Sequence, residues 1–319
     1  MQKKERIHNA MNFLPVDRIP TAFYTHFEDQ HDNTVADQVQ WANECNMDAL
    51  CVETDGFMKF AWDGPLVTAD DWGKIRPHKK DDWYIAGQVD RAKRIADGLK
   101  DSAAVFYMIY TPYSTIKHTL GGETRVNELF RANPDAISQA MQVIEQDNLL
   151  VIRELRSSGI DGLFISLQNA ELWRFTPEEY AEYLTPWDQR LIKAANEAFA
   201  DNIIHLCSWG CEPNNVQVWH DYDYKVVNWG VNIENDLSLA QGRAYFKPHS
   251  TLMGGFDVRP GKVIMTGSEH DIKQQTRHYI DEAGTTGFIL GTDCSLQKET
   301  PSEHIRWVVE ACEEYSRGI

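Results

Sequence analysis

Three residues in the second half of the chain are of types that bind transition metals. His205 and Cys207 lie in the segment IIHLCSWGC and Cys294 lies in FILGTDCS, each where a short apolar run comes to an end. One imidazole and two thiolates suit a zinc ion, and three protein ligands leave the fourth coordination position open, as in catalytic zinc sites. These residue types predict a catalytic zinc site, provided that the fold brings them together.

Other interpretations of the same residues stay open at this point. His205 could be a core histidine bonded to the backbone, and Cys207 an inert buried thiol. Cys211 could complete a local cluster with His205 and Cys207, without Cys294. The fourth ligand is undecided between water and three carboxylates: Glu53, Glu171 and Asp293.

The segments that must position these residues form a repeated pattern of strands and helices. Apolar runs of strand length recur along the chain, with helix-length amphipathic segments between most of them, which is typical of βα units with a parallel sheet. The fold class expected is α/β, a single-domain (β/α)8 TIM barrel over residues 1–319, in which the C-terminal strand ends meet at one mouth. The eight expected strands are residues 19–27, 49–54, 104–110, 162–167, 203–207, 225–229, 251–256 and 288–292.

Helix signals lie between the expected strands. Two helix starts combine a threonine N-cap, a proline at N1 and a capping-box glutamate: Thr176, Pro177 and Glu179, and Thr300, Pro301 and Glu303. Residues 55–88 are rich in Trp, Gly, Pro and Asp without a clean period, which predicts a long loop over the mouth. The expected helices are residues 35–46, 89–100, 135–157, 177–199, 237–245, 272–283 and 302–316.

Composition argues against several kinds of partner and compartment. Lys+Arg 31 against Asp+Glu 48 gives a net charge of −17, which repels phosphate backbones and anionic lipid, so neither nucleic acid nor membrane is expected to bind. No run approaches the ~20 apolar residues of a membrane span, and MQKKERIHNAMNF lacks the apolar core of a signal peptide. Six cysteines in 319 residues do not form a disulfide framework. We therefore expect a cytoplasmic protein.

Polar, titratable side chains follow the expected strand ends. Catalytic groups of a barrel enzyme project from this mouth, although strand ends are polar in any barrel. Four of these residues are candidates for a catalytic role: His26, Glu53, Asp55 and Gln168.

Four segments together resemble the uroporphyrinogen decarboxylase superfamily: KERIHNAMNFLPVDRIP, GIDGLFISLQNAELWRFTPEEYAEYLTPW, IIHLCSWG and GFILGTDCSLQKETPSEHIRWVVEA. The resemblance spans nearly the whole chain and implies a (β/α)8 barrel with its site at the mouth. It also implies one of two chemistries. One is metal-free decarboxylation of the acetate arms of uroporphyrinogen. The other is zinc-dependent transfer of a methyl group from a methylated corrinoid protein to a small thiol such as coenzyme M.

The resemblance is closer to the methyltransferase branch. Decarboxylases carry an arginine-rich segment after the first strand, and here that place reads TAFYTHFEDQHDN, without arginine. After the last strand the methyltransferases place a cysteine where decarboxylases place a histidine, and this chain has Cys294. The resemblance thus implies zinc held by His205, Cys207 and Cys294, with methylcobalamin carried on a separate protein. It further implies that two barrels can pair as a homodimer.

Two alternatives from other classes are kept. The segment IYTPYSTIKHTLGGE is similar to the decarboxylase stretch GPWTLASY, with His118 at the tyrosine position, and Asp55 matches an acidic residue of the decarboxylases. A carboxy-lyase that uses Asp55 and His118 without metal is the first alternative. The second is a non-catalytic module that docks a corrinoid protein.

Overall fold

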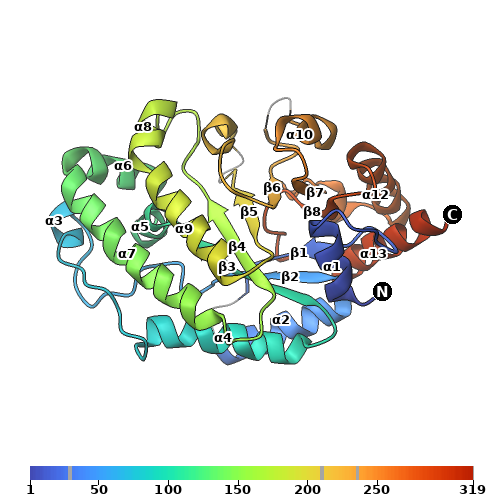
Figure 1. The fold of residues 1–319 in the computed structure, drawn as a ribbon, viewed down its shortest axis with the longest axis horizontal. Coiled ribbons are helices and arrows are strands. Elements are labelled where there is room, and N and C mark those ends of the chain that lie inside the picture. Colours follow the sequence, from blue (N-terminus) through green and yellow to red (C-terminus); the bar gives the residue numbers. More distant parts are fainter. Residues whose placement is uncertain (28–30, 209–211, 235–236, 319) are drawn as a thin grey trace.

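The computed structural model describes residues 1–27, 31–208, 212–234 and 237–318, in which eight strands form one parallel sheet in chain order (Figure 1). The hydrogen bond from Leu290 N to Pro20 O, 2.9 Å long, joins the last strand to the segment before the first and closes the ring. The predicted (β/α)8 barrel is confirmed. The strands are β1 (Ala22–Phe23), β2 (Ala49–Val52), β3 (Ala104–Tyr110), β4 (Gly162–Leu167), β5 (Ile203–Leu206), β6 (Val226–Trp229), β7 (Thr251–Phe256) and β8 (Phe288–Thr292).

The first strand is much shorter than residues 19–27, the range expected from the sequence. Beyond Ala22–Phe23 the chain meets its neighbours only through single bridges, from Thr21 to Leu290 and from Thr25 to Leu296. The seam between β1 and β8 is therefore the part of the barrel with the least regular pairing.

Helices form the outer layer around the strands. The expected helix at 177–199 is two helices, because Pro186 has no N–H for the bond to the carbonyl of residue 182, and the chain breaks at Leu184. The helices that follow strands as expected are α2 (His31–Cys45), α4 (Trp83–Leu99), α7 (Pro134–Leu155), α8 (Pro177–Tyr183), α9 (Thr185–Ala198), α10 (Leu239–Tyr245), α12 (Glu269–Ala283) and α13 (Ser302–Arg317).

Several short helices were not expected. The helix α1 (Lys3–Met11) packs Ile7, Ala10 and Met11 against the residues inside the barrel, so it covers the N-terminal end of the ring. The loop predicted at 55–88 ends at residue 82, because α4 begins at Trp83, and it contains α3 (Ala69–Trp72). The others are α5 (Pro112–Leu120), α6 (Glu123–Ala132), α11 (Val263–Thr266) and the 3₁₀ helix η2 (Val216–Trp219).

One of the two predicted helix caps is wrong. At α8 the Thr176 side chain accepts from Glu179 N in a capping box, as expected. At α13 the N-cap is Pro301, and no side chain caps the helix. Thr300 therefore lies one residue too early to reach the first-turn amides, and its hydroxyl has no hydrogen-bond partner.

Successive side chains of β5 point alternately into the barrel and outward toward the surrounding helices. Ile203 packs inside the barrel, whereas Ile204 and Leu206 pack outward against the helices. His205 and, one step beyond the strand, Cys207 therefore face the barrel axis. Among the described residues, none of the helices combines the length and the apolar character needed to span a bilayer.

Candidate metal centre

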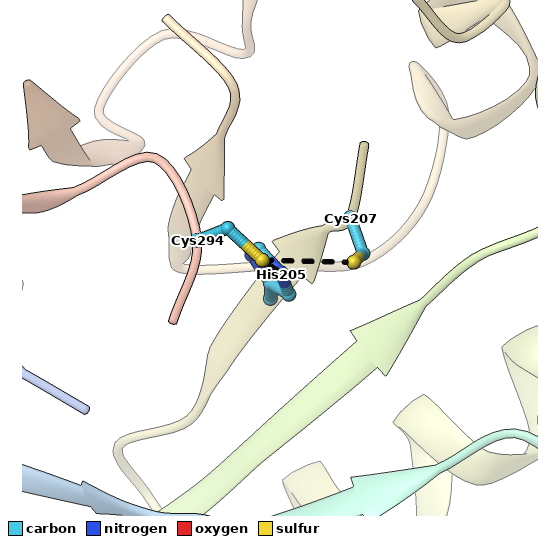
Figure 2. A group of neighbouring side chains, drawn as sticks. All are labelled: His205, Cys207 and Cys294. Carbon is cyan, nitrogen blue, oxygen red and sulfur yellow. Dashed lines mark hydrogen bonds between the residues drawn. The ribbon is translucent and has the colours of Figure 1, made fainter. Parts of the chain in front are cut away.

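Three ligand atoms from the ends of β5 and β8 meet at the mouth of the barrel (Figure 2). Cys207 Sγ lies 3.9 Å from Cys294 Sγ, and Cys294 Sγ lies 3.7 Å from His205 Nε2. All three ligand atoms are within 4.8 Å of one another. The fold thus brings together two positions that are 87 residues apart in the sequence.

Two of the three separations fit a tetrahedral zinc site, and the third, between Cys207 Sγ and the His205 ring nitrogen, lies within 4.8 Å. With Zn–S near 2.3 Å and Zn–N near 2.0–2.1 Å, tetrahedral angles place two sulfurs about 3.8 Å apart and a sulfur and a nitrogen about 3.6 Å apart. The distances of 3.9 Å and 3.7 Å agree with both values. His205 and Cys207 are buried and Cys294 is partly exposed, so one side of the group is open to an incoming ligand.

Asn228 determines which nitrogen of His205 faces the sulfurs. Its Nδ2 donates to Met253 O at 3.0 Å and to Thr292 O at 2.9 Å, which orients the side-chain amide. Its Oδ1 is therefore the atom that faces His205 Nδ1, at 2.6 Å, and Nδ1 must carry the proton. Nε2 therefore carries no proton, and its lone pair points toward Cys294, as a metal ligand requires. The Tyr24 hydroxyl donates to the same Oδ1 at 3.0 Å.

The two thiols differ in acidity. The hydrogen bond from Cys207 lowers the pKa of Cys294 well below its ordinary value, and the proximity of His205 lowers it further. The same hydrogen bond, together with burial, raises the pKa of Cys207 well above its ordinary value. Cys294 is therefore the first of the pair to become a thiolate, the form that binds metals and acts as a nucleophile.

The carboxylates considered as a fourth ligand hold other partners. Glu171 makes a bidentate ion pair with Arg174, at 2.6 and 3.1 Å, and both side chains are buried. Asp293 accepts from the backbone N–H groups of Val231 and Asn232, at 3.1 and 2.9 Å. Cys211 lies outside the described residues. Within the described chain the group of metal-ligating side chains at the mouth has three members, as a site with an open position requires.

Three of the predicted catalytic residues form a charged cluster beside the centre. His26 Nδ1 donates to Asp55 Oδ1 at 2.7 Å, and His26 Nε2 lies 3.9 Å from Glu53 Oε1. Burial lowers the pKa of His26, but the hydrogen bond and charge of Asp55 and the charge of Glu53 outweigh it and raise the pKa to about 9. Glu53 is fully buried, which raises its pKa. Its Oε1 accepts at 2.6 Å from the Oγ of Ser295, the residue directly after the candidate ligand Cys294.

The other two predicted catalytic residues, His118 and Gln168, are neighbours, and their side chains are hydrogen-bonded to each other. His118, on α5, packs its ring 4.7 Å from the ring of Tyr110. Burial, followed by the positive charge of Lys117, lowers the pKa of His118 to about 3, so the ring is neutral. Gln168 is buried just after β4 and donates to Ser166 Oγ at 3.2 Å. These residues can bind or orient a ligand, but they do not join the metal-ligating group.

Asn228 is a polar residue near the end of an expected strand, at residues 225–229, to which sequence reasoning assigned no role. It lies at an inward position of β6 and is the direct register partner of His205 on β5. A polar residue inside an apolar strand, opposite a histidine, is the signal that could have identified it, because a buried amide needs hydrogen-bond partners.

Comparisons with known proteins point to one family. Residues 61–315 match the family described as uroporphyrinogen decarboxylase (URO-D). A curated relative, uroporphyrinogen decarboxylase of Trichodesmium erythraeum (strain IMS101), is 21% identical over 226 residues, which are 68% of this chain and 60% of the relative's length.

Two solved structures share the architecture over nearly the whole chain. A methyltransferase from Methanosarcina mazei has a TM-score of 0.74 at 13% identity and covers 99% of both chains. A B12-independent methionine synthase from Shewanella sp. W3-18-1, in complex with selenomethionine, has a TM-score of 0.60 at 11% identity over 94% of this chain and 98% of that one. At such identities the likeness establishes a common fold.

Proposed function

Because the chain belongs to the uroporphyrinogen decarboxylase (URO-D) family, we propose that it is a methyltransferase of this fold. The enzyme moves a methyl group from a methylated corrinoid, carried on a separate protein, to a small thiol. Its zinc is held by His205, Cys207 and Cys294. The observation that carries the proposal is the convergence of one imidazole nitrogen and two sulfurs within 4.8 Å of one another, with one side open.

The chain's own residues prepare the site for a thiol. Asn228 holds the Nε2 lone pair of His205 toward the sulfurs, and Cys294 readily loses its proton. Bound zinc would supply the acidity that turns the acceptor thiol into a thiolate near neutral pH. The partly exposed Cys294 side of the group is where the acceptor and the methyl donor have to meet.

The mouth is less suited to a substrate with many carboxylates, which would need uncommitted cationic side chains to offset its charge. Arg174 is engaged with Glu171, and Arg91 donates to the backbone carbonyl of Asp55. His26 lies between Asp55 and Glu53, so its charge is offset by two carboxylates.

Metal analysis tests the ligand set. We expect about one zinc per purified chain, with at least a ten-fold loss of affinity in Cys207→Ala and in Cys294→Ala. Cys45→Ala is the matched control, because Cys45 is a buried thiol at the end of α2, and it should retain the metal. Full zinc occupancy in both ligand variants would contradict the proposal.

The reaction is tested with methylcobalamin and a panel of small thiols, following cobalamin absorbance and formation of the thioether. We expect demethylation that depends on zinc and is lost in Cys294→Ala. Binding of methylcobalamin without turnover for any thiol would instead support the docking module. Loss of carboxyl groups from uroporphyrinogen by the metal-free protein would support the carboxy-lyase.

A further inference from the structure

The two sulfurs of the candidate metal centre are in direct contact with each other. Cys207 Sγ and Cys294 Sγ lie 3.9 Å apart and share a hydrogen bond, so no other atom separates them (Figure 2). A covalent S–S bond is about 2.05 Å long, so the sulfurs have to approach by about 2 Å to form a disulfide. The other described cysteines are buried thiols on α2, β2 and α13: Cys45, Cys51 and Cys312.

Cys294 lies on a segment that can make this approach. It comes two residues after Thr292, the last residue of β8, and is therefore outside the regular strand. The chain that follows it meets the end of β1 through a single bridge, from Thr25 to Leu296. A small shift of Cys294 toward β5 therefore leaves the strand pairing of the barrel intact.

Cys207 is held in place and lies deeper than Cys294. Its backbone N–H donates to Leu167 O at 2.9 Å, and its carbonyl accepts from Asn214 Nδ2 at 3.2 Å. The Cys207 side chain is buried, whereas Cys294 is partly exposed. A small oxidant that enters from the open side therefore reaches the Cys294 sulfur first, and the Cys207 sulfur lies behind it at contact distance. This is the arrangement of an oxidant-sensing cysteine with a resolving cysteine.

We propose that Cys207 and Cys294 form a reversible disulfide when the centre holds no metal, with hydrogen peroxide as the oxidant. In the first step an S–O bond forms at Cys294, the O–O bond of the peroxide breaks, and one water leaves with the thiol hydrogen. In the second step the Cys207 sulfur attacks the Cys294 sulfur, so that the S–S bond forms, the S–O bond breaks and a second water leaves. Two thiols are oxidised and one peroxide is reduced.

Oxidation of this pair would also prevent metal binding. Zinc binds thiolates, and the sulfurs of a disulfide carry no negative charge, so His205 would be the one member of the group still able to bind the metal. A dithiol reductant reverses the change by thiol–disulfide exchange. This consequence rests on the proposed function, whereas the disulfide itself does not.

Peptide mapping of the wild-type protein tests the disulfide. Zinc is removed with a chelator, one equivalent of hydrogen peroxide is added, and the intact mass and the linked peptides are determined without reduction. We expect the loss of two hydrogens per chain, a link between the Cys207 and Cys294 peptides, and recovery of both thiols with dithiothreitol. A link from Cys207 to Cys211, a link between two chains, or added oxygen without any link would overturn the inference.

Single cysteine variants of the metal-free protein test the order of the two steps. Cys207→Ala should stop the reaction at a sulfenic acid on Cys294, which dimedone traps. Cys294→Ala should leave Cys207 unmodified at the same dose of peroxide, because that sulfur is buried. Cys45→Ala is the matched control and should form the link in wild-type yield. Equal trapping on Cys207 in Cys294→Ala and on Cys294 in Cys207→Ala would overturn the proposed order.

The same oxidation of the zinc-loaded protein separates this inference from the proposed function. We expect bound zinc to slow the reaction, and one zinc to be released for each disulfide formed, as read with a chromophoric chelator. A disulfide that forms equally fast with and without zinc would refute the ligand set and leave the disulfide in place. Tight zinc binding together with no disulfide in the oxidised metal-free protein would overturn the disulfide and leave the proposed function in place.

Discussion

His205 Nδ1 lies 2.6 Å from Asn228 Oδ1 inside the barrel, and the amide of Asn228 is itself oriented by the carbonyls of Met253 and Thr292. This contact fixes the tautomer of the candidate metal ligand His205 from its far side. Residues in this position commonly affect metal affinity almost as strongly as the ligands do.

We expect Asn228→Ala to lower zinc affinity by about 10- to 100-fold, because the His205 ring loses the partner that holds its proton on Nδ1. Affinity is measured by competition with a chromophoric chelator, and the tautomer by ¹⁵N shifts of the zinc-free protein. Tyr24→Phe is the matched control, since it removes the other donor to Oδ1 and leaves the His205 contact intact. Equal zinc affinity in Asn228→Ala and the wild type would contradict the role.

Glu171 should matter for stability and not for metal binding. Its carboxylate is fully engaged by Arg174, and both side chains are buried. Glu171→Gln replaces an ionised partner of a buried guanidinium by a neutral amide, which should lower the free energy of unfolding by roughly 1.5–3 kcal/mol, the range for a hydrogen bond to a charged group. Urea unfolding measures this loss, while zinc stoichiometry should stay at the wild-type value. A loss of zinc from the folded variant would make Glu171 a ligand.

His78 should stabilise the protein at low pH. Both ring nitrogens face acceptors, Asp147 Oδ2 at 2.7 Å and Ala61 O at 2.9 Å, so the ring donates to both only when protonated. Burial opposes the charge, but the hydrogen bond and charge of Asp147 outweigh it and raise the pKa of His78. The stabilisation is therefore complete below the unfolded pKa of about 6.5 and is lost as pH rises through the folded pKa.

The measurement is urea unfolding of His78→Gln and the wild type at pH 6 and pH 9. At pH 6 the variant should be less stable by roughly 1.5–3 kcal/mol, the range for hydrogen bonds to charged groups, and the difference should shrink at pH 9. His220→Gln is the control, because His220 is more exposed than His78 and pairs with a solvent-exposed Asp221. A difference independent of pH would argue against a charged His78.

Asp188 should have the opposite dependence on pH. Burial raises the pKa of Asp188 to about 7, although Tyr180 and Tyr222 donate to its Oδ2 at 2.9 and 3.1 Å. The folded state therefore retains a proton that the unfolded chain gives up near pH 4, and stability falls as pH rises from about 4 to 7. Asp188→Asn should gain stability relative to the wild type between pH 5 and pH 8 in urea unfolding, whereas the exposed Asp97→Asn should not.

Most strand positions, though not the extent of β1, and the three candidate metal ligands were predictable from local pattern. The apolar runs of β5 and β8 are bounded by polar residues, and the rule that catalytic groups follow barrel strands then places Cys207 and Cys294 at one mouth. The prediction needed no knowledge of packing, because the period of a strand fixes which side chains face inward.

Contacts that depend on several elements at once were not predictable. The orientation of the Asn228 amide depends on carbonyls contributed by β7 and β8, which no local window contains. The missing cap of α13 depends on a one-residue choice between Thr300 and Pro301 as the N-cap, and helix ends are the least certain part of a sequence-based assignment.

The strand pairing between β1 and β8 is sparse, so a bound ion would also stabilise the barrel. Cys294 follows β8 and His205 lies on β5, three strands away in the sheet, so one ion would link the last βα unit to another strand of the barrel. A ligand stabilises the state to which it binds. Removal of the metal should therefore make amide hydrogen exchange speed up first at Leu290 and Leu296, along the seam.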